Sequence, residues 1–104
     1  MPSNELERAF DDEMERICVR ANDEVGYKAA RFLNMVRAIG GREAVRKLLP
    51  NMSDGFTELW RRKRLDLTFE YVMLHPRWHP LFTDEERTVA DQRLTDCDYL
   101  KRPS

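Results

Sequence analysis

The chain has 104 residues, of which 36% are charged and 41% are apolar, and its formal net charge is −1. This length suits a single domain that buries its own core, and the composition excludes a disordered or fibrous chain. The longest apolar run, Tyr71–Leu74, is too short to span a membrane, and the first residues lack a secretory signal pattern. We therefore expect a cytoplasmic protein that makes no membrane contact.

The first helix is predicted over residues 4–21, with a capping box of Asn4 and Glu7 at its start. Its apolar residues lie on one face at helical spacing: Leu6, Phe10, Ile17 and Ala21. Because this stripe is narrow, we expect residues 1–24 to form an acidic amphipathic leader helix that docks weakly or awaits a partner.

A second helix is predicted from about residue 25 to residue 39, with a wide apolar face. That face consists of Tyr27, Ala30, Phe32, Leu33, Val36 and Ile39. Gly40-Gly41 ends this helix, since glycine adopts the left-handed conformation without a Cβ clash. A short third helix follows over residues 42–49 and stops at Pro50. Its inward residues are Ala44, Val45, Leu48 and Leu49.

Ser53 or Asp54 caps a short fourth helix, and Asp66 caps a fifth over residues 67–74. The residues expected inside are Phe56, Leu59, Trp60, Leu67, Phe69, Tyr71, Val72 and Leu74. Two prolines make residues 75–82 an irregular connector. A capping box of Thr83 and Glu86 opens the last helix, which buries Val89, Ala90 and Leu94.

Together these elements predict an all-α protein, a compact bundle of five or six short helices. The leader helix, residues 1–24, precedes a helical core domain over residues 25–95. Residues 96–104 are expected to form a flexible tail.

Three stretches of the chain carry a resemblance: GYKAARFLNMVRAIGGREAVRKLL, SDGFTELWRRKRLDLTFEYVML and LFTDEE. Over about residues 25–94 the chain resembles a widespread family of small bacterial helical domains of unknown function. The family pattern has glycine before Arg64, where this chain has Lys63. The resemblance implies a stand-alone protein or a terminal appendage, with a link to mobile elements or phage defence, and it implies no catalytic residues.

The charges are segregated along the chain, with a net −5 over residues 1–24, +7 over residues 25–64 and −3 over the remainder. A basic run, Arg61–Arg64, follows Trp60, and a second group of bases lies on the predicted third helix. Such clusters favour an acidic protein surface or the phosphates of a nucleic acid. The predicted partner-binding residues are Arg42, Arg46, Lys47, Arg61, Arg62, Lys63 and Arg64.

Other chemistry-bearing residues favour structural roles. His75 and His79 have a helical ligand spacing, but Pro76 interrupts the helix and no third ligand is near. Asp66 and Glu70 are also four residues apart, although a helix cap is the preferred interpretation of Asp66. The two cysteines, Cys18 and Cys97, are expected to be reduced thiols. No catalytic, cofactor or metal site is therefore predicted.

The sequence favours a non-enzymatic protein-interaction or regulatory module, whose partner is an acidic protein surface or a second copy of the chain. One alternative is a nucleic-acid-binding accessory protein that uses the same bases on phosphates. Another is a small inhibitor protein encoded by a phage or mobile element.

Overall fold

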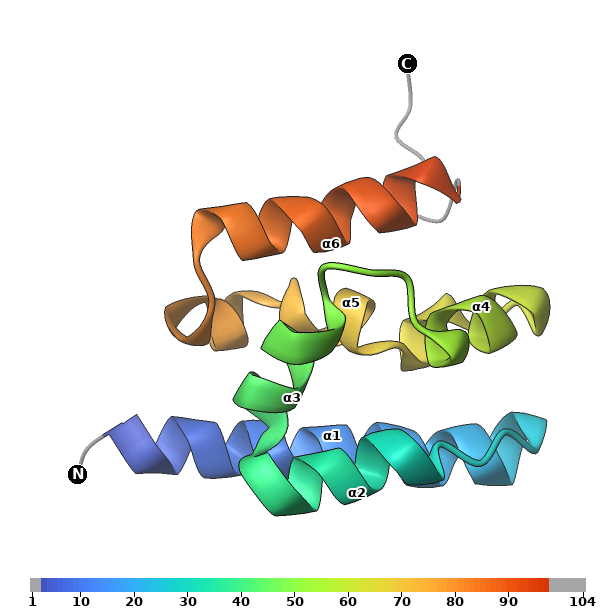
Figure 1. Ribbon diagram of the computed structural model, residues 1–104, viewed down its shortest axis with the longest axis horizontal. Coiled ribbons are helices and arrows are strands. Elements are labelled where there is room, and N and C mark those ends of the chain that lie inside the picture. The colour runs from blue at the N-terminus through green and yellow to red at the C-terminus, as the bar shows by residue number, and fades with distance from the viewer. Residues whose placement is uncertain (1–2, 98–104) are drawn as a thin grey trace.

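The computed structural model describes residues 3–97, in which helices pack in layers and no strand occurs (Figure 1). The helices are α1 Ser3–Val25, α2 Ala30–Ile39, α3 Gly41–Leu48, α4 Asp54–Arg61, α5 Phe69–Met73 and α6 Asp84–Asp96, with two 3-10 helices, η1 Leu65–Leu67 and η2 Pro76–Leu81. The predicted all-α bundle of five or six helices is confirmed. Among these helices, none combines the length and apolar character that a bilayer crossing requires.

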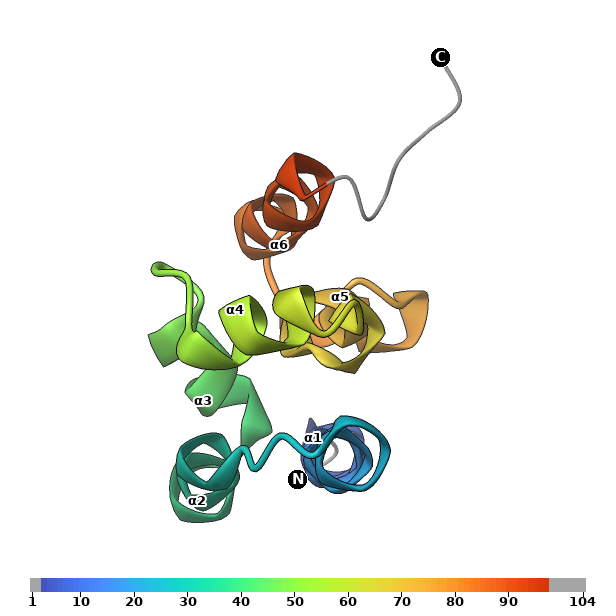
Figure 2. The ribbon, with the colours of Figure 1, turned by 90° about the vertical axis from the view of Figure 1, so that its right-hand side faces the viewer.

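In both ribbon views α1 and α2 lie side by side, and α6 lies at the opposite side of the molecule (Figures 1 and 2). The segment that contains α4 and α5 lies between them, and α3 connects α2 to that middle layer. Residues beyond 97, which include most of the predicted tail, lie outside the described residues, as does the side chain of Asn4 with its expected capping box.

Helix α1 is an integral part of the core, so the expectation that the leader docks weakly is wrong. Phe10 and Met14 are 0% exposed, and with Ile17 they belong to the largest cluster of buried side chains. Met14 lies on the same face as Phe10 and Ile17 and widens the predicted stripe. Residues 1–24 therefore contribute side chains to the same hydrophobic core as the later helices and do not form a separate leader.

The boundary between the first two helices also differs from the prediction. Helix α1 continues to Val25, and α2 begins only at Ala30. The reason is Gly26, whose φ of 71° ends α1, while the N–H of Tyr27 donates to the carbonyl of Ala21 over 3.1 Å. Residues 26–29 thus form a loop instead of the first turn of α2.

The predicted break at Gly40-Gly41 is confirmed, and each glycine has a separate reason. Gly40 has a φ of 88° and ends α2. A Cβ on Gly41 would lie 3.0 Å from side-chain atoms of both Phe10 and Met14, so a larger residue here would have to push these side chains back by a few tenths of an ångström. Asp11 accepts the N–H of Gly41 over 2.6 Å and so caps α3 from another helix.

Local caps start the later helices. Ser53 accepts the N–H of Phe56 over 3.1 Å, and Thr83 forms the predicted capping box with Glu86. The prediction for the fifth helix is wrong: Thr68, not Asp66, is the cap, and it accepts the N–H of Tyr71 over 3.2 Å. The residues before Thr68 form η1 instead, which buries Leu65 and Leu67.

The connector over residues 75–82 is more regular than expected, because it contains the 3-10 helix η2. Proline suits its first position, where no intrahelical N–H bond is needed. The connector is held by Trp78, which is buried and meets the ring of Phe10 edge-on at 5.2 Å between centroids.

Several apolar residues predicted to face inward are exposed, most of all Trp60 at 48%. In α6, for example, Ala90 and Leu94, one turn apart, are buried, whereas Val89 is 40% exposed. The residues corrected in this way are Ala30, Ile39, Trp60, Tyr71 and Val89.

Candidate functional site

The basic run Arg61–Arg64 forms the tight turn that ends α4. Lys63 has a φ of 62°, and it is the single residue other than glycine with a positive φ in the described chain. The N–H of Lys63 donates to Trp60 O over 3.0 Å and that of Arg64 to Leu59 O over 2.8 Å, which is a Schellman motif. This left-handed position is the one where the resembled pattern has glycine.

Two arginines of the run bind the end of α1. Arg62 Nη1 donates to the carbonyl oxygen of Val25 over 2.5 Å, at the negative end of the helix dipole. Arg64 Nη2 lies 2.6 Å from Glu24 Oε1, and its Nε donates to Asp66 Oδ1 over 3.0 Å. The arginines therefore join the turn after α4 to α1.

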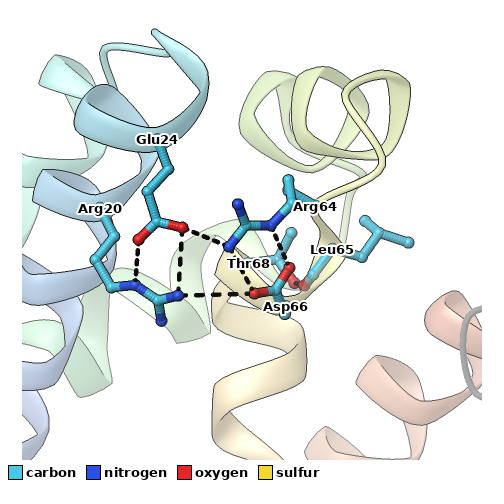
Figure 3. A network of polar contacts seen from close by, with 6 residues as sticks. All are labelled: Arg20, Glu24, Arg64, Leu65, Asp66 and Thr68. Atoms are coloured by element: carbon cyan, nitrogen blue, oxygen red, sulfur yellow. Dashed lines mark hydrogen bonds and ion pairs between the residues drawn. The ribbon is translucent and has the colours of Figure 1, made fainter.

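Figure 3 shows how Arg20 closes this contact into a network. Arg20 Nε lies 2.8 Å from Glu24 Oε2, and Arg20 Nη2 lies 4.0 Å from Asp66 Oδ2. Hydrogen bonds to Asp66 and then to Glu24 raise the pKa of Arg64, and hydrogen bonds from Arg20 and then Arg64 lower the pKa of Glu24. The alternating charges neutralise one another at the surface, where each single pair contributes little stability.

The bases of α3 are paired as well, but with other partners. Arg42 Nη1 lies 3.6 Å from Glu7 Oε2, and Arg46 Nε donates to Glu86 Oε2 over 3.0 Å. Lys47 is exposed and has no carboxylate partner within residues 3–97.

The predicted patch is therefore divided between two places. The α1 partners of Arg42 and Arg64 are Glu7 and Glu24, which lie about 25 Å apart at a rise of about 1.5 Å per residue. In Figure 1, α3 lies near the middle of α1, whereas α4 extends to the end of the molecule. The structure does not bring the α3 bases and the run Arg61–Arg64 onto one surface.

The histidines and the buried cysteine have local roles. His75 Nδ1 accepts the N–H of Arg77 over 3.1 Å, and His79 Nε2 lies 3.0 Å from the carbonyl oxygen of Leu74. Within residues 3–97, no three potential ligands come together as a metal site would require. Burial, with Glu15 nearby, raises the pKa of Cys18 to about 11, so this thiol is protonated at neutral pH.

Sequence reasoning missed a cavity of about 410 Å³ that α1, α2, α4 and α5 enclose together. Its inner wall is mostly apolar and includes Ile17, Cys18, Ala21, Phe56, Leu59, Leu67 and Phe69. Exposed residues also line it, so the cavity opens to solvent: Lys28, Ala30, Arg31, Met52 and Asp54. Cavities of about 300–1,000 Å³ with this character are the usual ligand sites of proteins.

One buried acid, Glu70, also lines the cavity and is 0% exposed. Its Oε2 accepts a hydrogen bond from Arg93 Nη1 over 3.0 Å, whereas Oε1 has no partner among the described residues. Burial raises the pKa of Glu70, against a backbone hydrogen bond and the contact with Arg93. The pairing of Glu70 with Asp66 that was considered from their spacing is not formed, since Asp66 binds Arg64. The sequence did contain one signal of this buried acid: Glu70 stands between Phe69 and the apolar run Tyr71–Leu74.

Comparison of the chain with models of protein families, with curated proteins and with solved structures finds no match. The resemblance to the bacterial family of helical domains thus stays a prediction.

Proposed function

We propose that this protein is a cytoplasmic, non-enzymatic protein-interaction or regulatory module that binds a segment of a partner protein in the cavity between α1, α2 and α4. The observation that carries the proposal is an apolar cavity of about 410 Å³ with an exposed rim. Such a concave apolar surface accepts the anchoring side chain of a partner segment, as hot-spot pockets do in known interfaces.

The charges at the rim favour an acidic partner. Lys28 and Arg31 are exposed, line the cavity and have no carboxylate partner within the described residues. Acidic groups beside the anchoring side chain would pair with these cations and guide the encounter. Asp54 is the opposing charge on the same rim.

The predicted partner-binding bases contribute unequally to this proposal. The arginines among them, Arg42, Arg46, Arg61, Arg62 and Arg64, each pair with a carboxylate of the chain itself. To meet an acidic partner they would exchange one carboxylate for another, with little net gain. Lys47 and Lys63 have no carboxylate partner within the described residues, so they are the members of the set available for an outside charge.

The same pairing disfavours the nucleic-acid alternative, because phosphates would compete with the internal carboxylates. Titration of a labelled duplex and a labelled single strand at rising salt tests it: phosphate binding predicts a steep loss of affinity with salt. The inhibitor alternative differs from the proposal only in the identity of the partner, which would bind in the same cavity. A link to mobile elements or phage defence likewise concerns only which protein is the partner.

Blocking the cavity from its rim tests the proposal without disturbing the core. Ala30 is exposed at the rim, and Ala38 is exposed on the same helix outside the cavity. Proteins retained from the native cells by the wild type should be retained by Ala38→Trp and lost from Ala30→Trp, with both variants folded by circular dichroism. Equal retention by the two variants contradicts the proposal. Self-association through the cavity predicts that Ala30→Trp alone lowers the mass in size-exclusion chromatography.

A further inference from the structure

The cavity between α1, α2 and α4 carries charges of opposite sign on two sides of its rim. Lys28 and Arg31, at the start of α2, supply positive charge, and Asp54 supplies negative charge in the first turn of α4. None of the three has an ion-pair partner within the described residues. Helices α2 and α4 belong to different layers in both ribbon views (Figures 1 and 2), so a segment that crosses the opening meets cations on one side and an anion on the other.

The interior between these charges suits an aromatic ring beside a second apolar side chain. Its volume of about 410 Å³ exceeds the volume of about 150 Å³ that holds a benzene ring in an apolar cavity of another protein. Met35 and Met52 line it, and Met52 is 51% exposed at the rim. Methionine side chains are flexible and make favourable contacts with aromatic rings, so they can close around such an occupant.

The chain itself contains a segment with the matching order of charges. Residues 98–104, which lie outside the described residues, have the sequence DYLKRPS. An acid precedes the apolar pair Tyr99-Leu100, and two bases follow it. With this pair in the cavity, the acid meets the cations at the start of α2, and the bases meet the acid of α4.

The position of α4 directs this segment to another molecule. Phe56 of α4 belongs to the cluster against which Cys97 packs, and it also lines the cavity, so α4 lies between the end of α6 and the cavity. The three residues from Cys97 to Leu100 span at most about 11 Å. A path around one side of a helix about 10–12 Å in diameter is at least about 16 Å long. The apolar pair therefore falls short of the cavity of its own chain.

We propose that residues 98–104 of a second copy of the chain occupy the cavity, with Tyr99 and Leu100 inside it and Asp98 paired with the cations at the start of α2. This inference rests on the proposed function, and it names the chain itself as a partner. Two copies that exchange these segments reciprocally form a closed dimer.

A peptide tests the contact directly. The full-length variant Tyr99→Ser/Leu100→Ser lacks the apolar pair, so its cavity is not filled by its own copies. This variant, labelled with ¹⁵N, is titrated with a peptide of residues 98–104 whose amino terminus is acetylated to remove the extra charge. Shifts of the amides that line the cavity report binding. A peptide with serine at both apolar positions should bind at least about tenfold more weakly, because it buries no apolar side chain.

Reversal of the charges tests the order of the contacts. Lys28→Glu, introduced into the labelled variant, should weaken binding of the natural peptide because it places two acids side by side. A peptide that carries Asp98→Lys should bind this Lys28→Glu chain more tightly than the natural peptide does. The natural peptide binding the Lys28→Glu chain more tightly than the reversed one would overturn the assigned orientation.

Sedimentation measures the exchange between copies. The wild type should approach the mass of a dimer as its concentration rises, and so should Ala38→Trp, which changes an exposed residue outside the cavity. Ala30→Trp and Tyr99→Ser/Leu100→Ser should remain monomers, with all variants folded by circular dichroism. An equal mixture of these two monomeric variants should regain association, since one supplies the segment and the other supplies the cavity.

A wild type that stays monomeric at every concentration overturns the exchange, even if the peptide binds. Peptide affinity that the two serines leave unchanged overturns the role of the apolar pair. Dimers that persist in Tyr99→Ser/Leu100→Ser but not in Ala30→Trp assign the cavity to another segment and overturn the role of residues 98–104. The retention experiment with Ala30→Trp decides separately whether the cavity binds a foreign partner, so failure of this inference is distinguishable from failure of the proposed function.

Discussion

Replacing Lys63 with glycine should stabilise the protein, although it removes a side chain. Lys63 has a φ of 62° at the end of α4. The left-handed conformation costs a residue with a Cβ about 1–2 kcal/mol. Glycine has no such cost, but its freer unfolded chain opposes folding by about 0.5–1 kcal/mol. The expected net gain in the free energy of unfolding is therefore about 1 kcal/mol.

Urea unfolding followed by circular dichroism measures this gain, provided that the m-values of the variants agree. In thermal unfolding it corresponds to a rise of about 4–8 °C in Tm for a domain of this size. Two variants serve as controls. Lys63→Ala removes the same charge but keeps the Cβ, so the free energy should change by less than about 0.5 kcal/mol. Lys47→Gly, inside α3, should lower it by about 1 kcal/mol.

The reasoning about Lys63 is refuted if Lys63→Gly is no more stable than Lys63→Ala. That result would mean that the Schellman turn tolerates a Cβ at this position without strain. The comparison uses two substitutions at one site, so loss of the lysine charge cannot account for a difference between them.

Three further predictions concern buried residues. Phe10→Ala should lower the free energy of unfolding by about 3–5 kcal/mol in chemical denaturation. A loss below about 1 kcal/mol would instead support the sequence-based expectation that residues 1–24 dock weakly. Burial raises the pKa of Glu70 in the folded state, so the protonated form stabilises the fold fully below the ordinary pKa of about 4.3. This stability is lost as the pH rises through the higher folded pKa. Relative to Glu70→Gln, the wild type should lose stability as the pH rises in urea titrations, and the opposite trend would show that Arg93 dominates. Cys18 should react with iodoacetamide at neutral pH much more slowly than in the urea-unfolded chain, as followed by mass spectrometry, because its pKa of about 11 leaves little thiolate; equal rates would contradict its burial.

The features that were predictable from sequence depend on neighbours within one helical turn. Ser53 and Thr83 cap helices through N–H groups three residues ahead, so the residue types alone identify them. Asp66 was the wrong cap because Thr68 is an equally good candidate two residues on. The choice between them depended on the burial of Leu65 and Leu67 in η1, which is a tertiary contact.

The candidate site was beyond prediction because its walls come from distant parts of the chain. Cys18, Phe56 and Glu70 line one cavity although about fifty residues separate the first from the last. No spacing rule relates them, since each belongs to a helix with its own period. Glu70 occupies a position whose helical face is buried, and only the packed neighbours show that one of its oxygens lacks a partner.

The sequence by itself determined the helical class, the break at Gly40-Gly41 and the caps at Ser53 and Thr83, because propensity and side-chain-to-backbone hydrogen bonds act within a few residues. Tertiary structure decided which carboxylates the basic residues pair with and whether α1 packs into the core. The basic run looked like a binding patch, but Arg64 pairs with Glu24, forty residues earlier, and only folding brings them together. Burial and long-range ion pairing are properties of the packed chain, and they pair most of the predicted patch with carboxylates of the chain itself.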